Sequence, residues 1–147
     1  MRKMLVLVAA AGVLVFAFNG TAAADSAYHT ERLALSGVSG APGGGMVVNA
    51  HANGPNAYAH EIYTLRHAVS GTYQVVLNIY ATSLSCEGAP IEIETAQIST
   101  NAAGNGRADV KFTPEDAGAL RGSTVSIKWT VSGPATYATQ CTVVTLD

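Results

Sequence analysis

The sequence has few of the residues, and none of the motifs, on which most enzyme active sites depend. Charged residues make up 12% of its 147 positions, and only four histidines and two cysteines occur. It contains no Gly-x-Ser-x-Gly nucleophile motif, no Walker phosphate loop, no His-Glu-x-x-His zinc motif and no EF-hand calcium loop. The sequence therefore predicts a protein that is not an enzyme and that needs no cofactor.

Long hydrophobic runs are also missing, with one exception at the N-terminus. Arg2 and Lys3 precede an uncharged run from Met4 to Phe18, and the small residues 22–24 follow it. This is the three-part pattern of a secretory signal peptide, and the run is shorter than the roughly 20 residues that span a bilayer. We therefore expect cleavage near Ala24. The mature chain is then secreted, to the extracellular space or the cell envelope, without stable membrane insertion.

Positive charge is scarce in the expected mature chain. The net charge of the full chain is −2, and loss of Arg2 and Lys3 with the signal peptide makes it about −4. The remaining basic residues are scattered along the sequence: Arg32, Arg66, Arg107, Lys111, Arg121 and Lys128. A nucleic-acid-binding protein needs a basic patch that neutralises phosphates, so we expect no nucleic-acid partner.

The two cysteines, Cys86 and Cys141, both lie in the expected mature chain. A protein bound for an oxidising compartment pairs such residues as a disulfide. Closing this loop would stabilise the fold by about 4 kcal/mol in the chain-entropy model. Two cysteines alone are too few for a structural zinc site, so we predict the disulfide Cys86–Cys141.

Alternating apolar and polar residues predict strands with one buried face. The clearest segments are 73–79, 107–112 and 123–131, and weaker ones are 32–35, 46–52, 91–98 and 137–146. Residues 57–68 also fit a helical spacing, but the β-prone Ile62-Tyr63-Thr64 favours a strand. Thr113, Pro114 and Asp116 predict a capped short helix over 114–120.

These elements predict an all-β chain, an antiparallel β-sandwich of seven to eight strands that is immunoglobulin-like in shape. We expect a single domain over 25–147. Residues 25–45 form a polar N-terminal segment with an early strand and a Gly-rich loop, and 46–147 form the sandwich core.

The segment Val69-Ser-Gly-Thr-Tyr73-Gln-Val75 resembles the tyrosine corner of immunoglobulin-like and fibronectin type III domains. The resemblance implies that the Tyr73 hydroxyl donates a hydrogen bond to backbone upstream. The order Cys86…Trp129…Cys141 departs from the antibody pattern, since Trp129 lies far from the first cysteine. The resemblance therefore concerns the shape and not membership of the family.

Histidine and tyrosine are concentrated between residues 49 and 80. The residues are Asn49, His51, Tyr58, His60, Tyr63, His67, Tyr73 and Tyr80. If the strands around Gly54-Pro55 form a hairpin, a four-residue turn pairs His51 with His60 near Asn49, where the imidazoles could hold Cu²⁺ or Zn²⁺. A three-residue turn pairs His51 with Ala59 and puts the two histidines on opposite faces.

The function predicted from these features is a secreted, non-enzymatic binding module. Its partner would be an extracellular protein or glycan, held by an exposed Tyr-rich face, because tyrosine offers a large rigid contact area with a polar tip. The candidate partner-binding residues are Asn49, His51, Tyr58, His60 and Tyr63.

Two alternative functions remain open at this point. One is an exported Cu/Zn-binding protein that uses His51 and His60. The other is an inhibitor of secreted enzymes that presents a rigid loop, for which residues 83–90, tied down at Cys86, are the best candidate.

Overall fold

The computed structural model describes residues 28–52, 58–120 and 122–146, and these form one antiparallel sheet of nine strands. The predicted signal peptide at 1–24 and the turn at 53–56 lie outside the described residues. Within the described ranges, no helix has the length and apolar character needed to cross a membrane.

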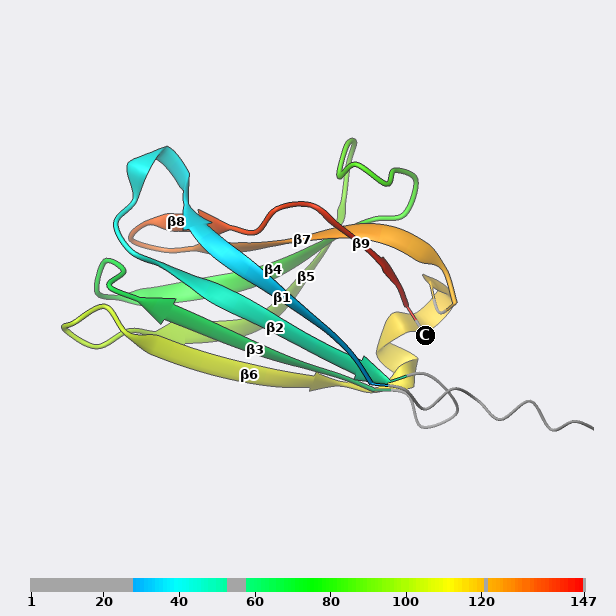
Figure 1. Cartoon of the computed structure of the whole chain (residues 1–147), viewed down its shortest axis with the longest axis horizontal. Helices are drawn as coiled ribbons and strands as arrows, with labels where there is room; N and C mark the ends of the chain where they lie inside the picture. Colours follow the sequence, from blue (N-terminus) through cyan, green and yellow to red (C-terminus); the bar gives the residue numbers. More distant parts are fainter. Residues whose placement is uncertain (1–27, 53–57, 121, 147) are drawn as a thin grey trace, which may run out of the picture.

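The strands follow one another with short connections, and two short 3₁₀ helices interrupt them (Figure 1). The strands are β1 (Tyr28–Gly37), β2 (Gly44–Ala52), β3 (Tyr58–Arg66), β4 (Thr72–Tyr80), β5 (Ile91–Ser99), β6 (Gly106–Phe112), β7 (Thr124–Ser132), β8 (Thr136–Ala138) and β9 (Thr142–Thr145). The helices are η1 (Val38–Gly40) and η2 (Pro114–Leu120). The strand favoured for residues 57–68 is confirmed as β3.

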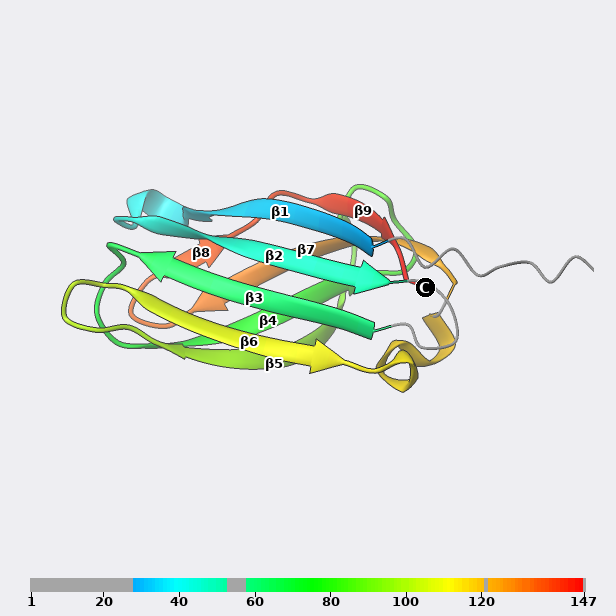
Figure 2. The same ribbon diagram turned by 60° about the horizontal axis from the view of Figure 1, so that its bottom comes forward.

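The sheet is a nearly closed barrel and not the two separate sheets of the predicted sandwich. Its strand order is β5-β4-β7-β8-β1-β2-β3-β6, with β9 paired to β7. Figure 2 shows β1, β2, β3 and β6 lying over the other strands. These two halves are joined by two residue pairs, Ser36 with Ala138 and Gly37 with Tyr137. The short β1–β8 ladder makes the sheet continuous, and the outer strands β5 and β6 lie against each other.

The core lies between the two halves and matches the alternation in the sequence. Trp129, Val125, Ile127 and Val131 of β7 are buried, as are the inward residues of β4. The Tyr73 hydroxyl donates to the Val69 carbonyl over 2.5 Å, which confirms the bond implied by the tyrosine-corner resemblance.

The predicted short helix is present, as a 3₁₀ helix. The carboxylate of Asp116 accepts hydrogen bonds from the backbone N–H of Thr113 at 2.6 Å and from its hydroxyl at 2.9 Å. These bonds lower the pKa of Asp116. Gly118 has a φ of 51°, which interrupts the helix.

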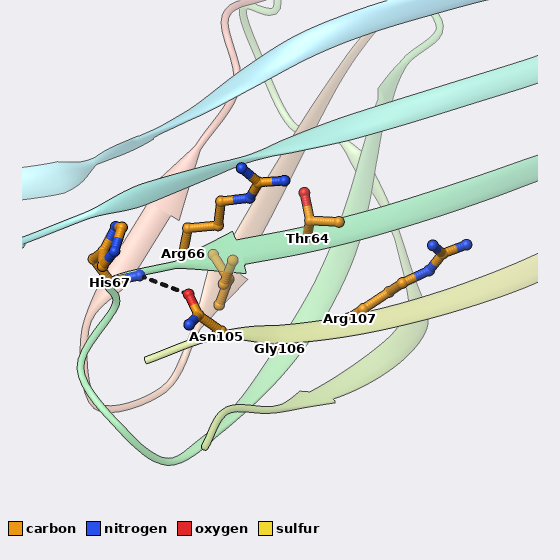
Figure 3. A pocket seen from close by; sticks show the side chains of 7 residues that line it. Thr64, Arg66, His67, Asn105, Gly106 and Arg107 are labelled. Atoms are coloured by element: carbon orange, nitrogen blue, oxygen red, sulfur yellow. Dashed lines mark hydrogen bonds between the residues drawn. The ribbon is translucent and has the colours of Figure 1, made fainter. Parts of the chain in front are cut away.

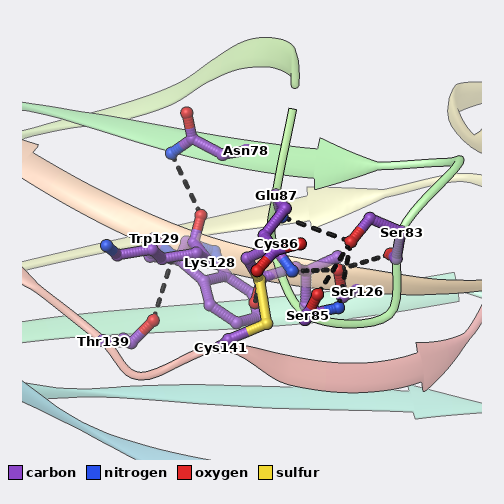
Figure 4. Close-up of a disulfide and its surroundings, with 11 residues drawn as sticks. Asn78, Ser83, Ser85, Cys86, Glu87, Ser126, Lys128, Trp129, Thr139 and Cys141 are labelled. Atoms are coloured by element: carbon purple, nitrogen blue, oxygen red, sulfur yellow. Dashed lines mark hydrogen bonds between the residues drawn. A yellow bond between two sulfur atoms is a disulfide. The ribbon is translucent and has the colours of Figure 1, made fainter. Parts of the chain in front are cut away.

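The predicted C-terminal strand is divided in two, which brings the strand count to nine. Between the pairs Thr130–Ala138 and Ile127–Thr142, three residues of the C-terminal segment lie opposite two of β7, as in a β-bulge. Thr139 accepts a hydrogen bond from the backbone N–H of Trp129 through its side chain at 3.0 Å. The break lies next to Cys141, which forms the predicted disulfide with Cys86 (Figure 4).

Candidate functional site

The hairpin of β2 and β3 has the register that separates the two histidines of the predicted metal site. His51 pairs with Ala59, and His60 pairs with Ala50. Side chains alternate between faces along a strand, so His51 lies on the inner face with Asn49 and His60 lies on the outer face. Of the two registers left open by the sequence, the one that pairs His51 with Ala59 is confirmed. The pairing of His51 with His60 is wrong, because the strands are offset by one residue from the register it requires.

Each histidine instead contacts a carboxylate. His51 Nε2 lies 3.1 Å from Glu31 Oε1, and His60 Nε2 lies 3.3 Å from Asp109 Oδ2. Among the described residues, neither histidine–carboxylate pair reaches the three or four protein ligands of zinc sites. The described residues contain no group of three or more His, Cys, Asp and Glu that could hold a metal ion. The metal site predicted from His51 and His60 is therefore not assembled.

The predicted Tyr-rich binding surface is not formed either. Asn49 and Tyr63 are buried, with exposed fractions of 7% and 0%, so neither is available to a partner. His60 faces outward, His51 faces inward, and Tyr58 lies in β3 with a side chain outside the described part. The β2–β3 register that separates the two histidines also directs the side chain of Tyr63 into the core.

A row of polar residues crosses the inner face where β1, β2 and β3 run side by side. Glu31 pairs with Asn49, and Asn49 pairs with Glu61. Asn49 Nδ2 donates to Glu31 Oε2 at 3.2 Å, while His51 contacts the other oxygen of Glu31. Most inward positions of the sheet are apolar, so this row is an exception to the pattern.

Glu61 lies at the buried end of this row and is 3% exposed. The Tyr63 hydroxyl donates to Glu61 Oε2, and the Trp129 indole N–H donates to the same oxygen at 2.8 Å. The Tyr63 hydroxyl also lies 2.8 Å from the hydroxyl of Thr95 on β5. Burial raises the pKa of Glu61 to about 7, although both hydrogen bonds act in the opposite direction. Burial and the neighbouring Glu61 raise the pKa of the Tyr63 hydroxyl.

The outer face of β1, β2, β3 and β6 collects the positive charge. Five Arg and Lys residues occur in the described part of the chain, and four of them lie here with exposed side chains: Arg32, Arg66, Arg107 and Lys111. None of these four forms an ion pair with another described residue. Asp109, the carboxylate on this face, is paired with His60. The face therefore carries unpaired positive charge, whereas Lys128 lies on β7.

An open depression of about 540 Å³ lies at one end of this face. Figure 3 shows the side chains of Arg66 and Arg107 on either side of Thr64. Thr64 and Arg107 are paired across β3 and β6, so Arg66 and Arg107 are diagonal neighbours with Cα atoms roughly 7–8 Å apart. The backbone N–H of His67 donates to Asn105 Oδ1 at 3.3 Å, which links the two strand ends that border the depression.

The positive face was not predictable from the sequence, because its residues are far apart in the chain. Within β6 the alternation of a strand puts Arg107 and Lys111 on one face, and both are exposed. Bringing Arg32 and Arg66 to the same face requires the order β1-β2-β3-β6. That order joins β3 to β6, which is not its neighbour in the sequence.

The loop predicted as an inhibitor segment is fixed by several bonds (Figure 4). The disulfide ties Cys86 to Cys141 with a Cα–Cα distance of 5.8 Å. The Ser126 hydroxyl donates to the Ser83 carbonyl at 2.7 Å and accepts from the Cys86 backbone N–H at 3.0 Å. Leu84 is 60% exposed. The loop is therefore pre-organised and presents one apolar side chain.

Comparison with protein-family models, with curated proteins and with solved structures gives no match. Three regions carry distinctive chemistry: the inner polar row, the positive outer face and the disulfide-tied loop.

Proposed function

We propose that the mature chain is an exported, non-enzymatic binding module that holds an anionic glycan on the outer face of β1, β2, β3 and β6. One observation carries this proposal: four of the five described Arg and Lys residues lie on one face of a chain with negative net charge. Guanidinium groups bind carboxylate and phosphate groups through two parallel N–H···O bonds. A polymer that carries such groups at intervals could contact several of these residues at once.

The N-terminal sequence supports the choice of an extracellular partner. A signal peptide over 1–24 would export the chain, and the Cys86–Cys141 disulfide is compatible with an oxidising compartment. Glycans with carboxylate or phosphate groups are anionic polymers of that environment. The proposed ligand is therefore a glycan and not a nucleic acid.

The chemistry of the face favours a glycan over a protein partner. Protein interfaces are anchored by buried aromatic residues, whereas the exposed side chains described on this face include the four cationic groups of Arg32, Arg66, Arg107 and Lys111. The depression is open, and Thr64 and Asn105 contribute polar side chains to its lining together with Arg66 and Arg107. It suits one acidic sugar whose hydroxyl groups bond to Thr64 and Asn105 while Arg66 and Arg107 hold its charged group.

Retention on immobilised polymers tests this proposal. The oxidised mature protein is expected to bind immobilised polygalacturonate, to elute as salt increases, and to pass through neutral dextran, because screening weakens contacts between exposed charges. Absence of retention on polygalacturonate and on a phosphate-bearing wall glycan would contradict it. Tighter binding to duplex DNA than to either glycan would also contradict it and would indicate a nucleic-acid partner.

An inhibitor of secreted enzymes is a second candidate, supported by the pre-organised loop around Cys86. Rigid loops bind with a lower entropic cost than flexible ones, and Leu84 would be the side chain that enters an apolar pocket. Residual activity of chymotrypsin-like and subtilisin-like proteases, measured with excess protein, tests this function. Inhibition that Leu84→Gly removes would support it, whereas full protease activity at every concentration would exclude both enzymes as targets.

A further inference from the structure

Asn49 lies between two carboxyl groups on the inner face of the barrel. Glu31 is its pair on β1 and Glu61 is its pair on β3. Its Nδ2 donates to Glu31 Oε2 at 3.2 Å. The two polar atoms of an amide lie on opposite sides of the same carbon, so Asn49 Oδ1 points away from β1. The residue paired with Asn49 on that side is Glu61.

Asn49 Oδ1 is buried and receives no hydrogen bond from the described residues. An unsatisfied buried acceptor destabilises the folded state, and such atoms are rare in folded proteins. An ionised carboxylate only accepts hydrogen bonds, but a protonated one donates through its O–H. A protonated Glu61 is therefore the neighbour whose chemistry would satisfy Asn49 Oδ1.

We propose that the closed barrel holds one proton on Glu61, shared with Asn49 Oδ1, and that loss of this proton loosens the contact between the two halves of the barrel. The proton belongs on Glu61 and not on Glu31 because the neighbours of the two acids differ. Glu31 is partly exposed and accepts from both Asn49 and His51. Glu61 is 3% exposed and is the residue paired with Asn49 on β3, and its ionised form could not donate to Asn49 Oδ1.

Hydrogen bonds around Glu61 connect the two halves of the barrel. Trp129 on β7 donates to Glu61 on β3 at 2.8 Å. Tyr63 of β3 contacts both Glu61 and, at 2.8 Å, Thr95 on β5. Strands β5 and β7 belong to one half of the barrel and β3 to the other, so these bonds cross the interior. A charge formed on Glu61 would draw water between the halves at this point.

The other groups around Glu61 do not offer an alternative proton carrier. Val110 is its pair on β6 and does not titrate. On β4 and β8, Tyr73 and Tyr137 bond to the backbone carbonyls of Val69 and Pro42. The described titratable groups nearest to Glu61 are therefore Tyr63 on its own strand, with Glu31 and His51 beyond Asn49.

The protonation of Glu61 is tested by following its side-chain carboxyl carbon by NMR as the pH changes. The proposal predicts that this signal titrates near neutral pH, well above the ordinary glutamate pKa of 4.5. A Glu61 signal that titrates at that ordinary value would overturn the proposal. This measurement uses the unmodified protein, so it does not depend on whether a variant folds.

Amide hydrogen exchange tests the loosening of the barrel. After correction for intrinsic exchange, the protection factors of β3 and β7 are expected to fall by on the order of 50-fold between about pH 5 and pH 8, if opening follows ionisation of Glu61. In Glu61→Gln, whose amide can donate to Asn49 at any pH, the fall is expected to disappear. The matched control Glu94→Gln, an exposed change on β5, should keep it. Protection that does not depend on pH in the unmodified protein would overturn the second part of the proposal.

Discussion

The indole of Trp129 and the carboxyl group of Glu61 are joined across the barrel by a 2.8 Å hydrogen bond, although 68 residues separate them in the sequence. Both residues are buried, with exposed fractions of 0% and 3%. Removing only one partner of such a buried hydrogen bond destabilises the folded state, because the remaining polar group is left without a protein partner and without water. The contact therefore specifies how β3 and β7 align.

Replacement of Trp129 by Phe should show this cost. The change removes the N–H donor to Glu61 and also leaves unfilled volume in the core. We expect the free energy of unfolding to fall by about 2–4 kcal/mol, measured by circular dichroism in urea because the single Trp is lost. A loss below about 1 kcal/mol would show that the bond to Glu61 contributes little.

The tyrosine corner provides a second test of a single bond. Tyr73→Phe removes the hydroxyl that donates to the Val69 carbonyl at 2.5 Å and keeps the buried ring. We expect a loss of about 1–2 kcal/mol in the free energy of unfolding. Tyr80→Phe, at a half-buried position on the same strand, serves as the control and should change stability by less than about 0.5 kcal/mol. Equal losses of stability in Tyr73→Phe and Tyr80→Phe would show that the hydrogen bond of the tyrosine corner does not stabilise the fold.

Reduction of the disulfide tests the long loop between Cys86 and Cys141. The bond closes a loop with a sequence separation of 55, so its loss should lower the free energy of unfolding by about 4 kcal/mol at most. Unfolding of the oxidised protein and of Cys86→Ala/Cys141→Ala measures the difference. The double variant should also release the loop around Leu84, and mass spectrometry after brief proteolysis would detect cleavage there. Equal stability of the two forms would contradict this role.

The pH dependence of stability follows from the direction of the Glu61 shift. Burial raises the pKa of Glu61 from 4.5 to about 7 in the folded protein, so the folded state holds a proton that the unfolded state has released between these values. The contribution of Glu61 is fully present below about pH 4.5 and is lost as the pH rises through about 7, a decrease of up to about 3 kcal/mol. Urea unfolding from about pH 5 to pH 8 measures it. In Glu61→Gln this decrease in the free energy of unfolding should be absent. If the variant shows the same decrease with pH as the unmodified protein, another titratable group causes it.

Much of the fold was predictable because the alternation of apolar and polar residues is a local signal. It identified β4, β6 and β7, and the capping residues Thr113 and Asp116 identified the short helix. Closure of the sheet was not predictable in this way. It depends on two residue pairs between β1 and β8, which join segments about a hundred residues apart.

The candidate site was harder to predict, because it depends on register and strand order. A shift of one residue between β2 and β3 exchanges the inner and outer faces, and this shift buried Tyr63 and separated His51 from His60. Glu61 also contradicts the usual preference for apolar residues at inward positions. Its burial is explained by the hydrogen bonds from Tyr63 and Trp129. Tyr63 is two residues away on the same strand, but Trp129 is 68 residues away, and no local pattern in the sequence predicts that contact.

Binding of an anionic glycan to the outer face is the central claim, and the dissociation constant for soluble polygalacturonate measures it most directly. The matched variants are Arg66→Glu/Arg107→Glu, which reverses two charges on the positive face, and Lys128→Glu, which reverses a charge on β7. Isothermal titration at low salt is expected to show binding by the unmodified protein and by Lys128→Glu. The double reversal is expected to bind at least about tenfold more weakly, because it replaces attraction by repulsion at the depression. Equal affinity of the double reversal and the unmodified protein would contradict the claim.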